Sequence, residues 1–303
     1  MLPEFDVQPL SGIRALTMAI NVPGPVAAAR LRELGATVVK VEPPGGDPLA
    51  RISPDWYESL TRDQRVIRLN LKEPDERNQL DHLLEESDLL VTATRSSALD
   101  RLSLGWPQIH ERFPRLCHVA IVGHPPPNDD KAGHDATYQG ELGLIAPPHL
   151  PRTLLADLAG AEQVVSAAVT LLFARERSGV AGYVRVSLVE AASIFADPLR
   201  YGLTTQGGPL GGALPGYNIY RTLDGWIVVA ALESHFWKKL QREISLCEPT
   251  QEELGRVFLT RRSGDWEEWA NVHDLPLVAL PEALAESSRD VTEEVAKCSS
   301  PLK

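Results

Sequence analysis

IRALTMAINVPGPVAAARLRELGATVVKVE, residues 13–42, holds the pattern that decides the fold. Its first eight residues form an apolar run that predicts a buried strand at 13–20. Pro23-Gly24-Pro25 then opens a helix that ends at Gly35, because proline is favoured in a first helical turn and glycine just past a helix end. TVVKVE at 37–42 follows as a second strand. This order predicts the first crossover unit of a parallel sheet.

The same alternation of strands and helices continues along the first two thirds of the chain. The further segments expected from it are helices at 75–87, around 106–113, near 137–145 and from 157 to 177, and strands at 88–93, 117–123 and from 183. Strands that alternate with helices predict an α/β fold, in which a Rossmann-like, doubly wound parallel sheet carries helices on both faces.

A glycine-rich stretch, QGGPLGG at 206–212, marks a change of pattern. After it, residues 218–232 read NIYRTLDGWIVVAAL, which has the turn chemistry of a β-hairpin. Helices are expected at 233–245, 250–259 and 264–272. We therefore expect a large domain over residues 1–205 and a smaller α+β domain over residues 206–303.

Composition excludes several classes of protein. The 303 residues carry a net charge of −11, which argues against nucleic acid or an anionic membrane as partner. Apolar runs such as VVSAAVTLLFA (164–174) are too short to span a bilayer, and the N-terminus has no signal-peptide pattern. The three cysteines lie far apart without a CxxC motif, which favours a cytoplasmic protein without a metal site.

The opening unit also raises the possibility of a nicotinamide site, with Glu42 as the acid that holds a ribose. The turn after the first strand is NVPGP, however, with one glycine and two prolines. A dinucleotide fingerprint needs several glycines so that the backbone can approach the pyrophosphate. The sequence therefore disfavours nicotinamide binding.

Four segments of this chain share a different resemblance. They are residues 21–25 (NVPGP), residues 30–48 (RLRELGATVVKVEPPGGDP), residues 88–106 (DLLVTATRSSALDRLSLGW) and residues 215–237 (PGYNIYRTLDGWIVVAALESHFW). Together they resemble the family III CoA transferases (the CaiB/BaiF group), which also contain α-methylacyl-CoA racemase. The resemblance implies an acyl-CoA substrate, a large domain that binds CoA, no permanently bound cofactor and an interlocked homodimer.

The resemblance assigns roles to polar residues that would otherwise read as helix caps. In AGHDATYQG (132–140), Asp135 matches the transferase nucleophile and His134 matches one of the two bases of the racemase branch. Asp157 in LLADLAG matches the opposing base, and Glu233 in AALESHFW matches a glutamate that supports the histidine. Tyr138 keeps the aromatic residue of the racemase-like GHDxxY pattern and is expected to contact the CoA ester. Without the resemblance, His134, Asp135 and Asp157 are ordinary N-cap candidates.

Four arginines are candidates for the CoA phosphates, which guanidinium groups bind in a bidentate manner. They are Arg51, Arg62, Arg65 and Arg95. Two departures from the family pattern bear on them. GHPPPNDDKAG (123–133) stands where relatives read GFGxxGP, and the family's C-terminal return segment is not found in this sequence.

The sequence thus leaves three functions open. The favoured one is α-proton exchange on a 2-methylacyl-CoA, with His134 and Asp157 as the two bases and Glu233 orienting the histidine. The second is CoA transfer between carboxylic acids with Asp135 as nucleophile. The third is a non-catalytic relative that acts as a binding subunit. The pairing of a histidine with a glutamate favours proton exchange, since a weakly acidic thioester α-proton needs a base of near-neutral pKa.

Overall fold

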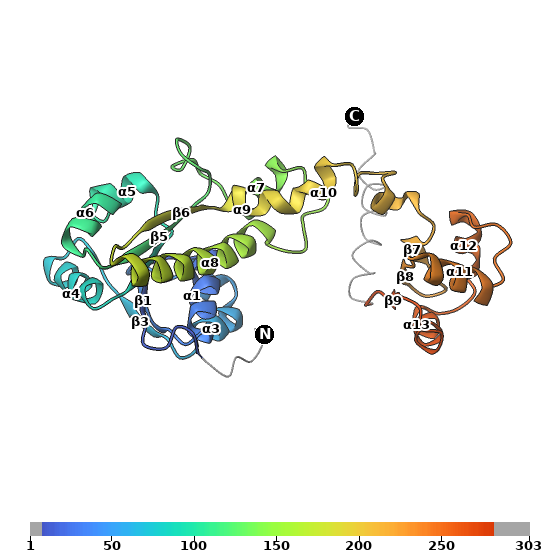
Figure 1. Cartoon of the computed structure of the whole chain (residues 1–303), viewed down its shortest axis with the longest axis horizontal. Helices are drawn as coiled ribbons and strands as arrows, with labels where there is room; N and C mark the ends of the chain where they lie inside the picture. Colours follow the sequence, from blue (N-terminus) through green and yellow to red (C-terminus); the bar gives the residue numbers. More distant parts are fainter. Residues whose placement is uncertain (1–7, 282–303) are drawn as a thin grey trace, which may run out of the picture. The chain divides into compact units, whose positions relative to one another are not determined.

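The computed structural model describes residues 8–281, which fall into two compact units (Figure 1). The first unit runs to Asp197, and the second begins at Pro198. The boundary expected after residue 205 lies a few residues further along the chain. Each unit has its own hydrophobic core and is described by itself below.

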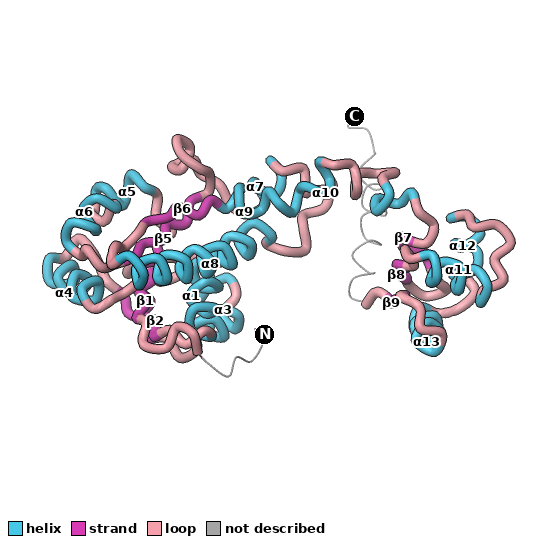
Figure 2. The backbone as a smooth tube through the Cα atoms, in the orientation of Figure 1, coloured by secondary structure: helices cyan, strands magenta, loops and turns pink. Residues whose placement is uncertain are grey.

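The first unit is built on one parallel sheet (Figure 2). Its strands are β1 (Arg14–Thr17), β2 (Thr37–Glu42), β3 (Arg65–Arg68), β4 (Leu89–Thr92), β5 (Cys117–Val122) and β6 (Tyr183–Ser187). Their order across the sheet is β3-β2-β1-β4-β5-β6, and every neighbouring pair is parallel. This is the Rossmann order, in which the direction of winding reverses between β1 and β4. The predicted α/β class is confirmed.

Helices cover both faces of this sheet (Figure 1). One face carries α1 (Pro23–Glu33), α2 (Pro48–Ile52), α3 (Pro54–Thr61), α7 (Asp135–Glu141), α8 (Leu155–Ser178) and α9 (Leu188–Ser193). The other face carries α4 (Pro74–Glu85), α5 (Ser96–Arg101) and α6 (Trp106–Arg112). A 3-10 turn (Ile194–Ala196) and α10 (Asp197–Arg200) follow α9. Because β-strands alternate their side chains, Ala15 enters one apolar core and Leu16 the other.

Helix α8 is the longest helix of the described chain. By length and composition alone, its 24 residues could cross a membrane. The helix is longer than the apolar run at 164–174 from which a membrane span was not expected. In this structure α8 packs against α1 and β5, and Ala161, Val164 and Ala168 are buried in the core. That is the arrangement of a helix in a protein core.

The second unit contains a small antiparallel sheet. Its strands are β7 (Tyr217–Arg221), β8 (Trp226–Ala230) and β9 (Leu277–Ala279). Helices α11 (Ser234–Glu243), α12 (Gln251–Phe258) and α13 (Ser263–Val272) supply the rest of its core, in which Trp266 is fully buried and donates from its indole nitrogen to the carbonyl of Phe258. The hairpin expected at 218–232 is therefore confirmed, in a sheet separate from the first. Residues 282–303 of the predicted small domain lie outside the described residues.

Candidate active site

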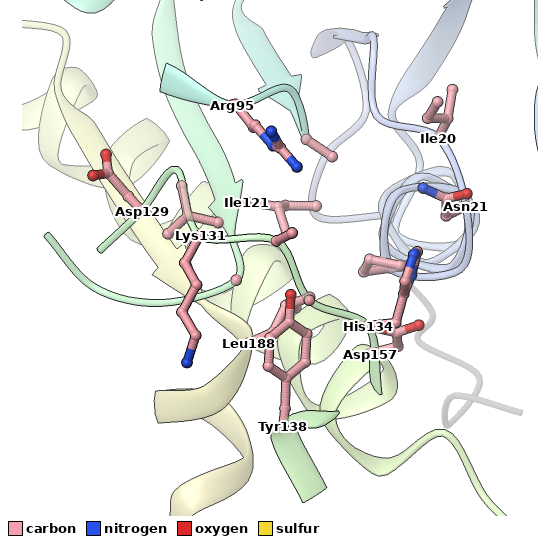
Figure 3. A pocket seen from close by; sticks show the side chains of 16 residues that line it. Ile20, Asn21, Arg95, Ile121, Asp129, Lys131, His134, Tyr138, Asp157 and Leu188 are labelled. Atoms are coloured by element: carbon pink, nitrogen blue, oxygen red, sulfur yellow. The ribbon is translucent and has the colours of Figure 1, made fainter. Parts of the chain in front are cut away.

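A pocket of about 290 Å³ opens at the carboxyl edge of the parallel sheet (Figure 3). Its walls come from the ends of β1, β4 and β5, the loop 129–133, and the starts of α7, α8 and α9. The polar side chains in this lining are Asn21, Arg95, Asp129, Lys131, His134, Tyr138 and Asp157. The pocket lies where the winding of the sheet reverses, which is the usual ligand position in open α/β sheets.

His134 is the N-cap residue of α7 and is exposed. The Thr137 hydroxyl holds its backbone, accepting from the amide of His134 at 3.1 Å and donating to its carbonyl at 2.7 Å. His134 and Thr137 thus form the capping box at the start of α7. His134 thus lies in the pocket lining at the point where the chain enters α7.

Asp157 lies in the first turn of α8 and also lines the pocket. Burial raises the pKa of its carboxyl to about 7, and the nearby charge of Asp135 acts in the same direction. No hydrogen bond joins this carboxyl to another side chain within residues 8–281 to lower the pKa again. A carboxyl that gains and loses its proton near neutral pH is suited to general acid–base catalysis.

Asp135 follows His134 directly, yet its side chain is placed differently. It is 5% exposed and does not line the pocket. One carboxylate oxygen accepts from the amides of Ala156 at 2.8 Å and Asp157 at 3.1 Å. The other accepts from Nε2 of Gln139 at 2.6 Å, and this amide nitrogen also donates to the carbonyl of Thr153. Asp135 therefore fastens α7 to the first turn of α8.

Tyr138, one helical turn after His134, is 3% exposed. Its ring packs edge-on against His124, with 5.3 Å between the ring centroids, and its hydroxyl points into the pocket (Figure 3). Burial raises the pKa of this phenol, and the charges of Asp157, Glu141 and Asp135 raise it further. The phenol is consequently neutral at physiological pH.

The four arginines expected to bind CoA lie in different places. Arg95 is the N-cap residue of α5, is exposed, and lines the pocket. Arg65 begins β3 and lines a separate depression with Asp75, His82 and Glu86. Arg51 and Arg62 are exposed near the ends of α2 and α3, and neither lines the pocket that contains His134. The structure therefore brings one of the four arginines to the predicted bases.

Glu233 lies in the second unit. It is the N-cap residue of α11 and is exposed. Its expected contact with His134 would join the two units and remains a prediction.

Several residues at the site were not singled out from the sequence. His124 is 6% exposed, and its Nε2 lies 3.0 Å from the Glu141 carboxylate, which also accepts from Lys131 at 2.7 Å. Lys131 lines the pocket. Both belong to GHPPPNDDKAG, which in sequence is noticeable only as a departure from the family pattern. The histidine and the lysine in that loop were the features of the sequence that could have identified these two residues as part of the site.

A buried ion pair supports the turn on the other side of the pocket. Nζ of Lys40, fully buried, donates to Asp47 at 2.8 Å and to the carbonyl of Ala19 at 3.0 Å. The other carboxylate oxygen of Asp47 accepts from the amides of Asn21 and Leu49, each at 3.0 Å. Asn21 has a φ of 67°, a left-handed conformation that needs such external support.

A second, more apolar pocket of about 270 Å³ opens at the same edge of the sheet. Met18, Val41, Pro43, Leu69 and Leu102 are among its lining residues. It shares Ile20 with the first pocket, so the two flank the ends of β1 and β4. Across residues 8–281, no three His, Cys, Asp or Glu side chains form a group that could hold a metal ion.

Comparison with known proteins agrees with this architecture. The profile of CoA-transferase family III matches residues 10–290. The chain belongs to this family. A probable fatty acyl-CoA transferase of Mycobacterium tuberculosis is 28% identical over 77% of this chain and 68% of its own length. The human α-methylacyl-CoA racemase is 29% identical over 78% of this chain and 65% of its own.

A solved structure shares the fold as well. The crystal structure of a hypothetical protein from Mycobacterium tuberculosis superimposes with a TM-score of 0.77 at 26% identity, covering 89% of this chain and 83% of that one. This member of CoA-transferase family III spans about two thirds of the length of the curated relatives named above. Those relatives include both a probable fatty acyl-CoA transferase and a racemase, so membership of the family does not select the reaction.

Proposed function

We propose that this family III protein exchanges the α-proton of an acyl-CoA, with a 2-methylacyl-CoA as the preferred class of substrate. The observation that carries the proposal is that Asp157, with its pKa raised to about 7, lines the same pocket as His134. Proton exchange with inversion needs two groups, one that removes the proton and one that returns it. A carboxyl with its pKa raised to about 7 suits both directions of the reaction, because it can hold or release a proton near neutral pH.

In the proposed cycle, one of the two groups takes the α-proton, and negative charge develops on the thioester oxygen. The other group returns a proton to the opposite face of the α-carbon. Asp157 can take either part because it is present in both protonation states near pH 7. The Glu233 carboxylate would orient the His134 imidazole in the assembled enzyme. The lining of the pocket around the pair also includes the apolar residues Ala93, Ile121 and Leu188.

In this proposal, CoA is bound as part of the substrate. Two pockets on either side of Ile20 suit an elongated ligand, with the thioester in the polar pocket and an apolar or aromatic portion in the other. Arg95 lines the polar pocket and forms no ion pair within residues 8–281, so its guanidinium is available to a phosphate. Arg51, Arg62 and Arg65 would contribute only long-range attraction from their present positions.

CoA transfer through Asp135 is the second candidate, and similarity to a probable fatty acyl-CoA transferase favours it. A nucleophilic Asp135 would have to leave two backbone amides and the Gln139 side chain before attacking a thioester. That cost is why we place proton exchange first.

We also propose that the protein works as an interlocked homodimer in the cytoplasm, as the family resemblance implies. Large apolar side chains on the first unit support a partner, since Phe173 is 62% exposed and Ile194 is 66% exposed. Light scattering at micromolar concentration tests this, with a dimer as the expected result and a stable monomer as the contrary one.

Incubation with a panel of acyl-CoAs in deuterated water, with and without a free carboxylic acid, tests the reaction. Deuterium at the α-carbon without movement of CoA supports proton exchange. CoA that moves to the added acid supports transfer through Asp135. Neither reaction, together with no heat of CoA binding in calorimetry, supports the non-catalytic alternative.

A further inference from the structure

The hydroxyl of Tyr138 faces the polar pocket, although the rest of its side chain is buried. It forms no hydrogen bond with any residue from 8 to 281, although the residue is 3% exposed. Buried tyrosine hydroxyls usually find a partner. Tyr220 illustrates this in the second unit, where the hydroxyl donates to the carbonyl of Pro215 at 2.7 Å. The Tyr138 hydroxyl instead points into the polar pocket, which leaves it free for a bound ligand (Figure 3).

Two glycines from separate segments make room for this side chain. A Cβ atom on Gly133 would lie 2.8 Å from the Tyr138 hydroxyl oxygen, and a Cβ on Gly123 would lie closer still. Neither glycine has a positive φ, so conformational freedom does not explain them. Their common property is that a larger residue would push the phenol out of the pocket. The hydroxyl is thus held in position by three segments, namely the end of β5, the loop before α7, and α7 itself.

The location of Tyr138 relates it to one of the two proposed bases. The amide of Tyr138 bonds to the carbonyl of His134 at 3.3 Å, and both side chains line the same pocket. In a thioester, the carbonyl carbon is bonded to the α-carbon from which the proton is removed. If the α-carbon of a bound thioester contacts His134, the carbonyl oxygen of that thioester lies only one bond further from the α-carbon than the carbonyl carbon. Tyr138, one turn further along, is then a candidate to contact this oxygen.

We propose that the Tyr138 hydroxyl donates a hydrogen bond to the thioester oxygen of the substrate and stabilises the enolate that forms there. This rests on the proposed function, since it assigns Tyr138 a catalytic role in that same pocket. The proton stays on the tyrosine throughout. Burial and three neighbouring carboxylates, those of Asp157, Glu141 and Asp135, raise the pKa of the phenol, which keeps it a donor rather than a base. A donor fixed in advance at an oxygen where charge develops stabilises the transition state more than the ground state.

The test uses Tyr138→Phe, which removes the hydroxyl and keeps the ring, with Tyr220→Phe as the control for a buried tyrosine outside the pocket. Loss of one such donor lowers the turnover number on the order of 10²–10³-fold. We expect Tyr138→Phe to slow deuterium exchange by this factor with little change in KM. Tyr220→Phe should lower the melting temperature and leave exchange unchanged.

A second readout does not depend on exchange. Acetoacetyl-CoA ionises readily to an enolate that absorbs in the near ultraviolet. The full-length protein should raise the enolate fraction of the bound probe, and Tyr138→Phe should lower that fraction while Tyr220→Phe does not. If Tyr138→Phe does not fold, incorporation of a fluorinated tyrosine at position 138, a stronger donor, should raise the enolate fraction instead.

The outcomes separate the two proposals. Enolate stabilisation that depends on Tyr138, without deuterium exchange on any acyl-CoA, keeps the role of Tyr138 and removes the proposed reaction. A wild-type protein that binds acetoacetyl-CoA without raising its enolate fraction overturns the role of Tyr138. An enolate fraction and an exchange rate that are equal in wild type and Tyr138→Phe overturn it as well.

Discussion

The carboxylate of Asp135 accepts a hydrogen bond from the backbone amide of Asp157 at 3.1 Å. This bond places a buried negative charge directly behind a residue that lines the pocket. The charge of Asp135 adds to the burial of Asp157 and helps to raise the pKa of its carboxyl. One residue of the GHD segment thus supports the start of α8, while its neighbour His134 lines the pocket.

Asp135→Asn should weaken the joint between α7 and α8. The amide oxygen can still accept from the two backbone amides, but the charge is lost and the Gln139 side chain meets a donor instead of an acceptor. Hydrogen bonds to a charged group contribute about 1.5–3 kcal/mol each. We expect a loss of a few kcal/mol in the free energy of unfolding, measured by chemical denaturation. Asp55→Asn, which changes an exposed aspartate in the first turn of α3, is the control and should have little effect.

Asp157→Asn should change how stability depends on pH. The folded protein holds the Asp157 proton up to about pH 7, while the unfolded chain releases it near pH 4. Asp157 therefore stabilises the fold below pH 4, and that contribution falls as the pH rises from about 4 to 7. Asparagine cannot ionise, so the variant should be more stable than wild type at pH 8, by about 1–4 kcal/mol. Denaturation at pH 5 and pH 8 checks this. Parallel pH profiles of wild type and variant would show that Asp157 carries no unusual pKa.

The Lys40–Asp47 pair should be sensitive to the loss of either partner. Both side chains are fully buried, so Lys40→Met leaves the Asp47 carboxylate as an uncompensated charge. Removing one partner of a buried pair costs about 3–5 kcal/mol. Arg14→Met breaks an ion pair with Glu86 whose side chains are more than half exposed, and should cost at most about 1 kcal/mol. Equal effects of the two substitutions would contradict the role given to Lys40.

Arg95→Gln should weaken acyl-CoA binding. A charged hydrogen bond to a phosphate is worth about 1.5–3 kcal/mol, which corresponds to roughly a tenfold or larger rise in Kd. The dependence of Kd on salt should also become less steep, because one cation fewer meets the phosphates. Arg65→Gln removes an arginine that lines a different depression and should leave Kd nearly unchanged. Calorimetric titration with CoA at two salt concentrations measures both effects.

Most of the parallel sheet could be predicted from sequence because its central strands are continuous apolar runs. Every residue of β4 and β5 is buried. Strand β3 was not predicted, since RVIR at the sheet edge is largely exposed and has two arginines in four residues. The helices α2 and α3, which follow one another directly after β2, were also not predicted.

The site could be predicted only as a set of residues. Sequence position alone could not show that the side chains of His134 and Asp135 differ in burial, because that depends on where α8 begins in space. The pairing of His124 and Lys131 with Glu141 likewise depends on how a proline-rich loop returns to α7. Glu233 remains a prediction, as it belongs to the second unit.

Deuterium incorporation from each enantiomer of a 2-methylacyl-CoA, by wild type, His134→Ala and Asp157→Asn, tests the central claim most directly. If two bases act on opposite faces of the α-carbon, wild type exchanges the α-proton of both enantiomers and interconverts them. Each variant should then lose interconversion by at least about 10²-fold, which is the contribution of one positioned base. Residual exchange should favour opposite enantiomers in the two variants. Interconversion that survives both substitutions, or depends only on Asp135, would contradict proton exchange by His134 and Asp157.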